Sequence, residues 1–314
     1  LRIYYLGMPA LAIYNFGNAV YSAVGNTKKP LYYLGFSGVL NIILNLFFVI
    51  VCRMDVAGVA LASIISQYVS AVLILQALLR SKDIYALHPG KLRMDRELTR
   101  DILKLGMPSG LQNVIFQFAN SFVQMGVNSF DATMVAGNSA ATNADALVYD
   151  VMAAFYTACG SFMGQNYGAG RIDRVRRSIW VAHGMTLCFT VLFSVAILIL
   201  GRPLYLLFGA DEDPAVLAAG MRMLWLIGPF YSLYVPVEIF SGAMRGVGKT
   251  LVPTLITCVG VCLLRIVWTT VAYHVSPSFD AVVLSYPVSW FCASAAFLVY
   301  HRWGHWLPAR DPQS

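Results

Sequence analysis

The sequence predicts an all-α integral membrane protein in which about nine transmembrane helices are seen. Of its 314 residues, 58% are hydrophobic and 12% are charged, and the mean hydropathy is +0.66. Soluble domains carry about 25% charged residues, about twice the fraction found here. A soluble fold has no surface for this many apolar side chains, whereas lipid solvates them. Backbone amides in lipid must be bonded internally, which leaves helices or closed barrels. A barrel would show alternating segments of about ten residues. The apolar runs here are instead about twenty residues long, enough to cross a bilayer as helix.

The apolar segments are separated mostly by short loops. Two of them, 134–163 and 216–244, are long, and we expect them to be tilted or broken. Leu1 opens the chain inside an apolar run, so we expect a fragment that lacks its true N-terminus. The nine segments lie near residues 3–24, 32–52, 56–79, 103–129, 134–163, 178–200, 216–244, 251–274 and 279–301.

Basic residues collect in alternate loops. Lys and Arg are retained on the cytoplasmic side of a membrane, so we expect the odd-numbered loops and the C-terminus to be cytoplasmic. The net charge of +7 then comes from these loops and not from a nucleic-acid site. Their basic residues are Lys28 and Lys29; Arg80, Lys82, Lys91, Arg93, Arg96, Arg100 and Lys104; Arg171, Arg174, Arg176 and Arg177; Arg245 and Lys249; and Arg302.

A short internal repeat divides the chain. Residues 23–30 read AVGNTKKP and residues 246–253 read GVGKTLVP, each after a span that carries glycine and proline. The matched loops share an orientation, which is typical of parallel repeats in transporters. The expected organisation is a partial N-terminal lobe of three helices at 1–80, a cytoplasmic linker at 81–101, a six-helix C-terminal lobe at 102–302 and a cytoplasmic tail at 303–314.

Three motifs carry a family resemblance: the two repeat loops, residues 164–171 (GQNYGAGR) and residues 244–248 (MRGVG). With them the chain resembles the multidrug and toxic compound extrusion (MATE) family. The resemblance implies a transporter of twelve helices in two lobes around a central cleft, of which this chain holds helices four to twelve. It also implies secondary active efflux of organic, often cationic, compounds in exchange for sodium ions or protons. We expect a monomer in the bacterial inner (plasma) membrane.

The resemblance leaves the coupling ion open between sodium and proton. One branch of the family carries an Asp in the first helix, which would lie among the missing helices. Another branch carries a Glu in helix seven, where this sequence has the neutral Gln117. That branch also carries a sodium-site Asp in helix ten, which is missing here, and Tyr234 lies near its place. Glu238 follows Tyr234 by one helical turn.

Glu238 is the first candidate ion-binding residue. An ionisable side chain inside a span costs about 2.5–3.5 kcal/mol on insertion scales, so it faces a wet cavity or a polar neighbour. Arg245 follows at helical spacing. Glu238 either binds a cation or a proton during transport, or forms a structural pair with Arg245 or another helix.

The fourth segment carries five amide side chains on one helical face. They recur at intervals of four, three, four and four residues. Such a stripe lines a hydrated cleft or, alternatively, joins helices by hydrogen bonds. We take Gln117, Asn120 and Gln124 as candidate binding residues. The full stripe is Asn113, Gln117, Asn120, Gln124 and Asn128.

Asp145 shares a face of the fifth segment with Tyr149, and Asn143 is close by. A carboxylate among aromatic rings suits an organic cation, because ring faces attract positive charge. The alternative is a buried Asp hydrogen-bonded to helix seven or eight. Asp150 is expected on a different face. Arg265 stands in the middle of the eighth segment, where we expect a structural ion pair, as for Arg245; an anion or substrate contact is the alternative for Arg265.

Other function classes lack their motifs. The chain has no His-Glu-x-x-His or paired-His cluster for catalysis, no filter-like repeat of a channel and no metal-ligand spacing among its cysteines. We therefore expect no enzyme activity, metal or cofactor, and as partners a small organic substrate and the lipid bilayer, with no nucleic acid. A lipid-linked oligosaccharide flippase of related architecture is the alternative function, and it favours a strongly cationic cavity.

Overall fold

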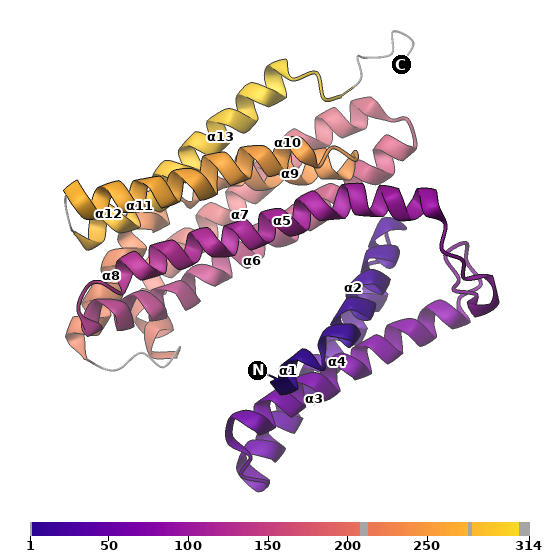
Figure 1. Ribbon diagram of the computed structural model, residues 1–314, viewed down its shortest axis with the longest axis horizontal. Coiled ribbons are helices and arrows are strands. Elements are labelled where there is room, and N and C mark those ends of the chain that lie inside the picture. Colours follow the sequence, from indigo (N-terminus) through magenta and orange to yellow (C-terminus); the bar gives the residue numbers. More distant parts are fainter. Residues whose placement is uncertain (1, 208–212, 276–277, 308–314) are drawn as a thin grey trace. The chain divides into compact units, whose positions relative to one another are not determined.

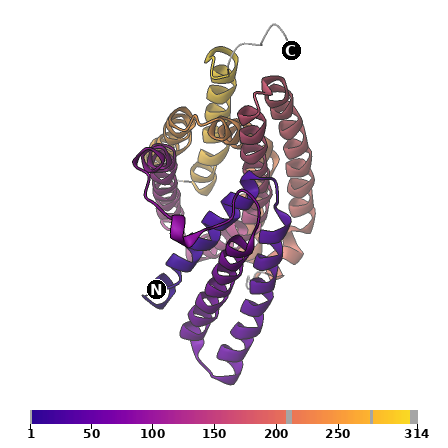
Figure 2. The same ribbon diagram turned by 90° about the vertical axis from the view of Figure 1, so that its right-hand side faces the viewer.

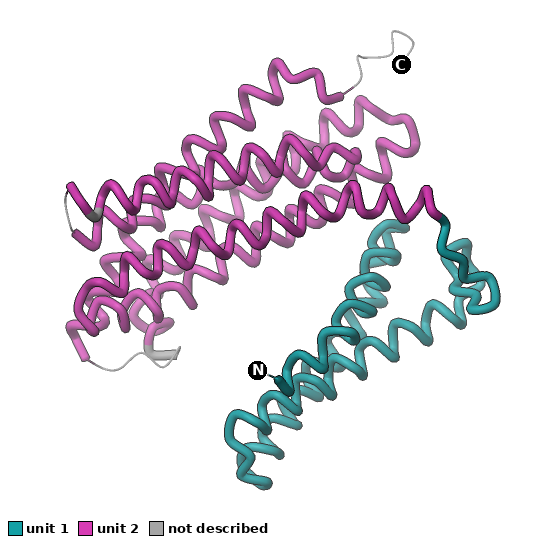
Figure 3. The backbone as a smooth tube through the Cα atoms, in the orientation of Figure 1, with its two compact units in different colours: residues 1–95 teal, residues 96–314 magenta. Residues whose placement is uncertain are grey.

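The computed structural model describes residues 2–207, 213–275 and 278–307. All regular secondary structure within these ranges is helical, which confirms the predicted fold class. The contacts between residues divide the chain into two compact units, residues 1–95 and 96–314 (Figure 3).

Unit 1 is built around α4, which packs against both α2 and α3 (Figure 1). Its small core is formed by Tyr14, Tyr21, Ile74 and Leu78. Most apolar side chains of α3 are exposed, as expected of a helix that faces lipid. The helices are α1 (Arg2–Tyr5), α2 (Met8–Ala23), α3 (Lys28–Leu46) with its π-helical continuation η1 (Phe47–Val51), α4 (Asp55–Arg80) and the short η2 (Pro89–Lys91).

Unit 2 contains the longer helices and the main core. Its central helix is α6, which contacts α7, α8 and α9 and lies beside them in both views (Figures 1 and 2). The helices are α5 (Arg96–Val127), α6 (Ala132–Gly168), α7 (Ile172–Leu207), α8 (Pro214–Ile227), η3 (Gly228–Tyr234), α9 (Val235–Gly246), α10 (Leu251–Thr257), η4 (Cys258–Leu263), α11 (Leu264–Val275), α12 (Phe279–Val283) and α13 (Ser285–Trp303).

Every expected apolar segment coincides with a helix or with consecutive helices. In the described ranges, seven of these segments are long and apolar enough to cross a membrane. The other two are α2, which has 16 residues, and α5, whose polar stripe lowers its hydropathy. The expected break in 216–244 is the 3-10 segment η3, which begins at Gly228 and Pro229. The helix over 134–163 is instead continuous, because α6 contains no proline.

The repeat predicted from sequence has the same backbone conformation in both copies. Gly25 and Gly248 have φ of 78° and 81°, a region that favours glycine. In each copy, the amide after the glycine donates to a carbonyl five residues earlier, at 2.9 Å from Asn26 to Tyr21 and 2.8 Å from Lys249 to Met244. This pattern is a Schellman motif, which ends a helix and satisfies its last carbonyls.

The expected lobe boundaries differ from the structure in two places. Helix α5 begins at Arg96, inside the stretch expected to be a linker. In the expected tail, Trp306 and Leu307 are buried against the core of unit 2. Residues 308–314 lie outside the described residues.

Close helix packing positions α9 against α6. Gly160 on α6 faces Gly242 on α9, and Gly164 faces Gly246 one turn later. The carbonyl oxygen of Gly246 lies 3.1 Å from the position that a Cβ of Gly164 would take. Small residues of this kind let helix backbones approach in a membrane.

Candidate functional site

Two cavities open along the polar face of α5, and Phe116 contributes to both. The Glu238 cavity has a volume of about 290 Å³ and the Asp145 cavity about 580 Å³. Unit 2 alone supplies the walls of both. The stripe is divided between them: Asn113 lines the Glu238 cavity, and Gln117, Asn120 and Gln124 line the Asp145 cavity.

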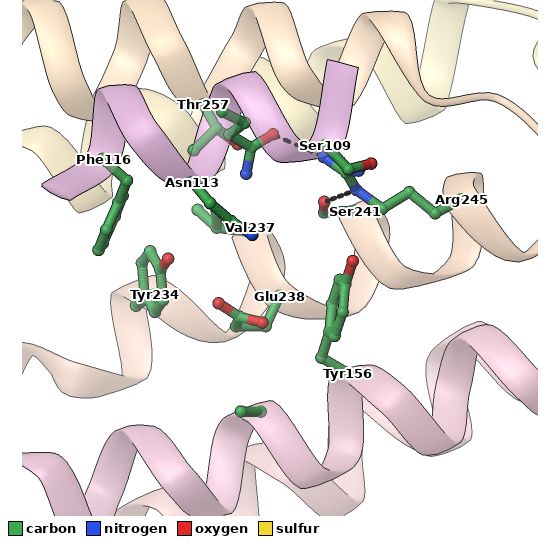
Figure 4. A pocket seen from close by; sticks show the side chains of 12 residues that line it. Ser109, Asn113, Phe116, Tyr156, Tyr234, Val237, Glu238, Ser241, Arg245 and Thr257 are labelled. Atoms are coloured by element: carbon green, nitrogen blue, oxygen red, sulfur yellow. Dashed lines mark hydrogen bonds between the residues drawn. The ribbon is translucent and has the colours of Figure 1, made fainter. Parts of the chain in front are cut away.

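The Glu238 cavity places one carboxylate among aromatic and hydroxyl side chains. Glu238 stands in the first turn of α9, which follows directly on η3. In Figure 4, its carboxylate lies between the side chains of Tyr234 and Tyr156. Ser241 lies on the same helix and on the same wall. A carboxylate in this setting can bind a small cation or a proton.

Arg245 closes the Glu238 cavity at one end and joins three helices. It donates to Ser109 and Gln112 on α5, the latter at 2.6 Å, and to Thr254 on α10 at 3.2 Å. It also donates to Ser241 on its own helix at 3.3 Å (Figure 4). It forms no ion pair within 4.0 Å with a described acidic side chain, so the expected structural ion pair stays a prediction. Neutral oxygens from α5 and α10 satisfy the guanidinium instead.

The Asp145 cavity holds charges of both signs. Asp145, Asp150 and Arg265 all contribute to its lining. Asp150 therefore shares a cavity with Asp145, although helical spacing predicted a different face. Asn143 is exposed on α6 and is not part of this lining.

Asp145 lies in an aromatic cluster. Its side chain is 6% exposed, and its carboxylate accepts a hydrogen bond from the hydroxyl of Tyr231 on η3. The ring of Tyr149 lies 6.1 Å from that of Tyr231 and 6.2 Å from that of Trp290. The structure thus shows the buried, hydrogen-bonded Asp that the sequence offered as the alternative, and binding of an organic cation at Asp145 stays a prediction.

Arg265 is almost completely buried on α11. Its Nη1 donates to Asn120 Oδ1 at 2.7 Å and its Nη2 to Ser289 Oγ at 3.3 Å. Its guanidinium carbon lies 4.3 Å from the ring centre of Tyr286 and 5.6 Å from that of Phe116. Among the residues that the structure covers, no acidic side chain forms an ion pair with it within 4.0 Å, so the expected pair stays a prediction for Arg265 as well.

Sequence reasoning missed several residues that line these cavities. Ser109, Gln112 and Tyr156 line the Glu238 cavity, and Tyr286 lines the Asp145 cavity. Ser109 stands four residues before Asn113 and extends the polar face of α5 by one turn, which the spacing could have revealed, whereas Gln112 immediately precedes Asn113 and does not follow that spacing. Tyr286 stands in α13 beside serine residues such as Ser285 and Ser289, and no pattern was drawn from them at the level of sequence.

The family model named MatE matches residues 108–271, which include every residue that lines the Glu238 cavity and every one that lines the Asp145 cavity except Tyr286. The chain belongs to the MatE family. A second model, Lipid II flippase MurJ, matches residues 1–96, which correspond to unit 1. The family predicted by the sequence resemblance is thereby confirmed, and the chain is a multi-pass membrane protein of a transporter family.

Curated relatives match along most of the chain. The probable multidrug resistance protein YpnP of Bacillus subtilis is 29% identical over 98% of this chain and 68% of its own length. The probable multidrug resistance protein NorM of Thermotoga maritima is 24% identical over 83% of this chain and 56% of its own length. A MATE crystal structure in complex with MaL6 is 19% identical, with a TM-score of 0.89 over 96% of this chain and 68% of that one. This MatE chain therefore spans about six tenths of these relatives.

Proposed function

We propose that the complete protein exports small organic compounds across the membrane by alternating access, in exchange for sodium ions or protons. The family is one of ion-coupled membrane transporters, and the relatives are named multidrug resistance proteins. In this scheme, the lobe formed by unit 2 carries both a substrate cavity and an ion cavity.

The observation that carries the proposal is the pair of carboxylate-bearing cavities on one polar helix face. Glu238 and Asp145 lie on different helices, α9 and α6, and in different cavities. Ionisable residues inside membrane segments are expensive and mark ion or substrate pathways. We assign the coupling cation or proton to Glu238 and cationic groups of the substrate to Asp145, with Tyr149 as an aromatic neighbour.

The basic loops support an orientation for the chain. Arg171, Arg174 and Arg177, at and after the end of α6, are exposed, and so is Lys249 after α9. The expected topology puts both loops on the same side. We infer that this side is cytoplasmic and that the protein works in the inner membrane of a bacterium, as a monomer without nucleic acid.

The decisive experiment is transport by the protein expressed from its complete reading frame and reconstituted into sealed vesicles. A fluorescent organic cation is loaded, and a sodium or a proton gradient is imposed separately. We expect gradient-dependent efflux that Glu238→Gln abolishes. The control Arg222→Gln removes an exposed arginine that pairs with Asp280 outside both cavities, and it should keep efflux. Absence of efflux under either gradient, from correctly folded protein, would refute the proposal.

A second candidate is a flippase for lipid-linked pyrophosphate cargo. The match of unit 1 to Lipid II flippase MurJ favours it, as does the positive charge of Arg265. The two carboxylates in the same cavity oppose it, because they repel a pyrophosphate. Transfer of a labelled lipid-linked pyrophosphate between leaflets, without efflux of any soluble cation, would favour this function over export.

A further inference from the structure

Arg265 keeps a positive charge in the interior of a membrane-spanning segment. It belongs to the candidate span Leu251–Ala272, and its side chain is 1% exposed. Arginine stays protonated in proteins, so it keeps its charge even when buried. Buried charges are expensive unless another group compensates them. The charge of Arg265 therefore requires an explanation in terms of its surroundings.

The direct contacts of Arg265 include no carboxylate that would compensate this charge. Its direct hydrogen-bond acceptors, Asn120 and Ser289, are both neutral. Its Nε is buried and has no hydrogen-bond partner. No ion pair within 4.0 Å joins it to an acidic residue of the described chain. The guanidinium is thus held in place by neutral groups, with a donor left over.

The Asp145 cavity connects this guanidinium to a space that a ligand can fill. A volume of about 580 Å³ suits a small organic molecule. Phe116 and Tyr286, the two rings beside the guanidinium, also line the cavity. The opposite charges, Asp145 and Asp150, come from α6. One wall therefore offers a cation among aromatic rings and another offers carboxylates.

We propose that the Asp145 cavity binds aromatic molecules that carry a carboxylate, and that Arg265 selects them. A planar guanidinium matches a carboxylate in shape and charge. The aromatic frame of the molecule packs against Phe116 and Tyr286, and a cationic group on the same molecule points to Asp145. The inference rests on the proposed export function and narrows its substrate class.

A pair of dyes tests this selection directly. Rhodamine 110 and rhodamine 123 share one xanthene frame, but the first has a free carboxylate where the second has a methyl ester. The assay is kcat/KM for each dye in vesicles that contain the complete protein. Arg265→Gln should lower the ratio of rhodamine 110 to rhodamine 123 by about tenfold or more, the usual effect of losing a hydrogen bond to a charged group. Arg222→Gln, outside the cavity, should leave the ratio unchanged.

Two further variants separate selection from folding. Arg265→Lys keeps the charge and loses the planar fork, so the ratio should fall less than in Arg265→Gln. Asn120→Asp places a carboxylate beside Arg265 at the position of the present 2.7 Å hydrogen bond, almost without changing shape. It should lower the ratio as much as Arg265→Gln does, because the new carboxylate neutralises the guanidinium.

The possible outcomes distinguish this inference from the proposed function. Export of rhodamine 123 with an unchanged ratio in Arg265→Gln and Asn120→Asp would overturn the inference and leave the function standing. An equal loss for both dyes assigns Arg265 a purely structural role and overturns it as well. If neither dye moves, the export function fails, and equilibrium binding to the purified protein decides. An Arg265-dependent preference for rhodamine 110 then supports the inference, whereas such a preference for farnesyl pyrophosphate instead of the dye overturns it.

Discussion

The contact between α6 and α9 predicts a measurable cost for a single methyl group. A Cβ at Gly246 would lie 2.4 Å from the carbonyl oxygen of Gly160 and 3.0 Å from the Cβ of Met163. The oxygen belongs to a helix backbone, which has no flexible end that could move aside. Gly246→Ala should therefore push the helices apart by about half an ångström or more, and overpacking of this kind costs about 1–3 kcal/mol.

The assay is thermal unfolding of the purified protein in detergent. For a folded unit of this size, each kcal/mol shifts the midpoint by about 2–4 °C, so we expect a fall of roughly 2–12 °C. The matched control is Gly184→Ala on α7, where no atom lies within 4 Å of the added carbon. That variant should keep or raise the midpoint, because alanine favours helix over glycine by about 1 kcal/mol. Equal midpoints for the two variants would refute the close-packing argument.

Three further predictions concern the cavities. A cysteine that replaces Gln117 or Gln124 should react with a water-soluble maleimide. A cysteine that replaces Ala119 or Val123, which are buried on the same helix, should not react. Equal labelling of the four positions would contradict a hydrated stripe. Arg245→Met should lower the unfolding midpoint by the equivalent of about 1–3 kcal/mol, because it leaves Gln112 and Thr254 without their shared donor, and an unchanged midpoint would count against the three-helix junction. Tyr231→Phe and Asp145→Leu should each destabilise the protein, and the double variant should cost less than the two single costs together, because each change removes the same hydrogen bond; strict additivity would contradict that bond.

Much of the helical architecture could be predicted from local sequence alone. Apolar runs of span length give helices in lipid because no other open structure satisfies the backbone there. Gly25 and Gly248 end their helices through the same left-handed turn. The repeated sequence motif therefore predicted the repeated backbone conformation. The break at η3 was also foreseeable, because Gly228 and Pro229 stand inside a segment too long for one span.

The partners of the buried charges could not be predicted in this way. Helical periodicity assigns a residue to a face but does not say which helix that face meets. A pair between Arg245 and Glu238 was one alternative that the sequence offered because the two stand on one helix, yet Arg245 donates to Ser109 and Gln112 on α5, more than a hundred residues away in sequence. Packing between helices that are distant in sequence determines the partners of Arg245. These partners are neutral oxygen atoms, which a search of the sequence for opposite charges does not find.

The length of the amide stripe explains why it serves two cavities. From Asn113 to Asn128 the stripe rises about 22 Å along α5, more than a single small cavity spans. Along that rise α5 contacts first α10 and η4 and then α11 and α12, so successive amides meet different neighbours. Asn113 therefore faces the carboxylate of α9, whereas Asn120 fixes the guanidinium of α11. One polar face thus connects a site that suits a cation with a site that also holds a fixed positive charge, and movement of α5 would change both together.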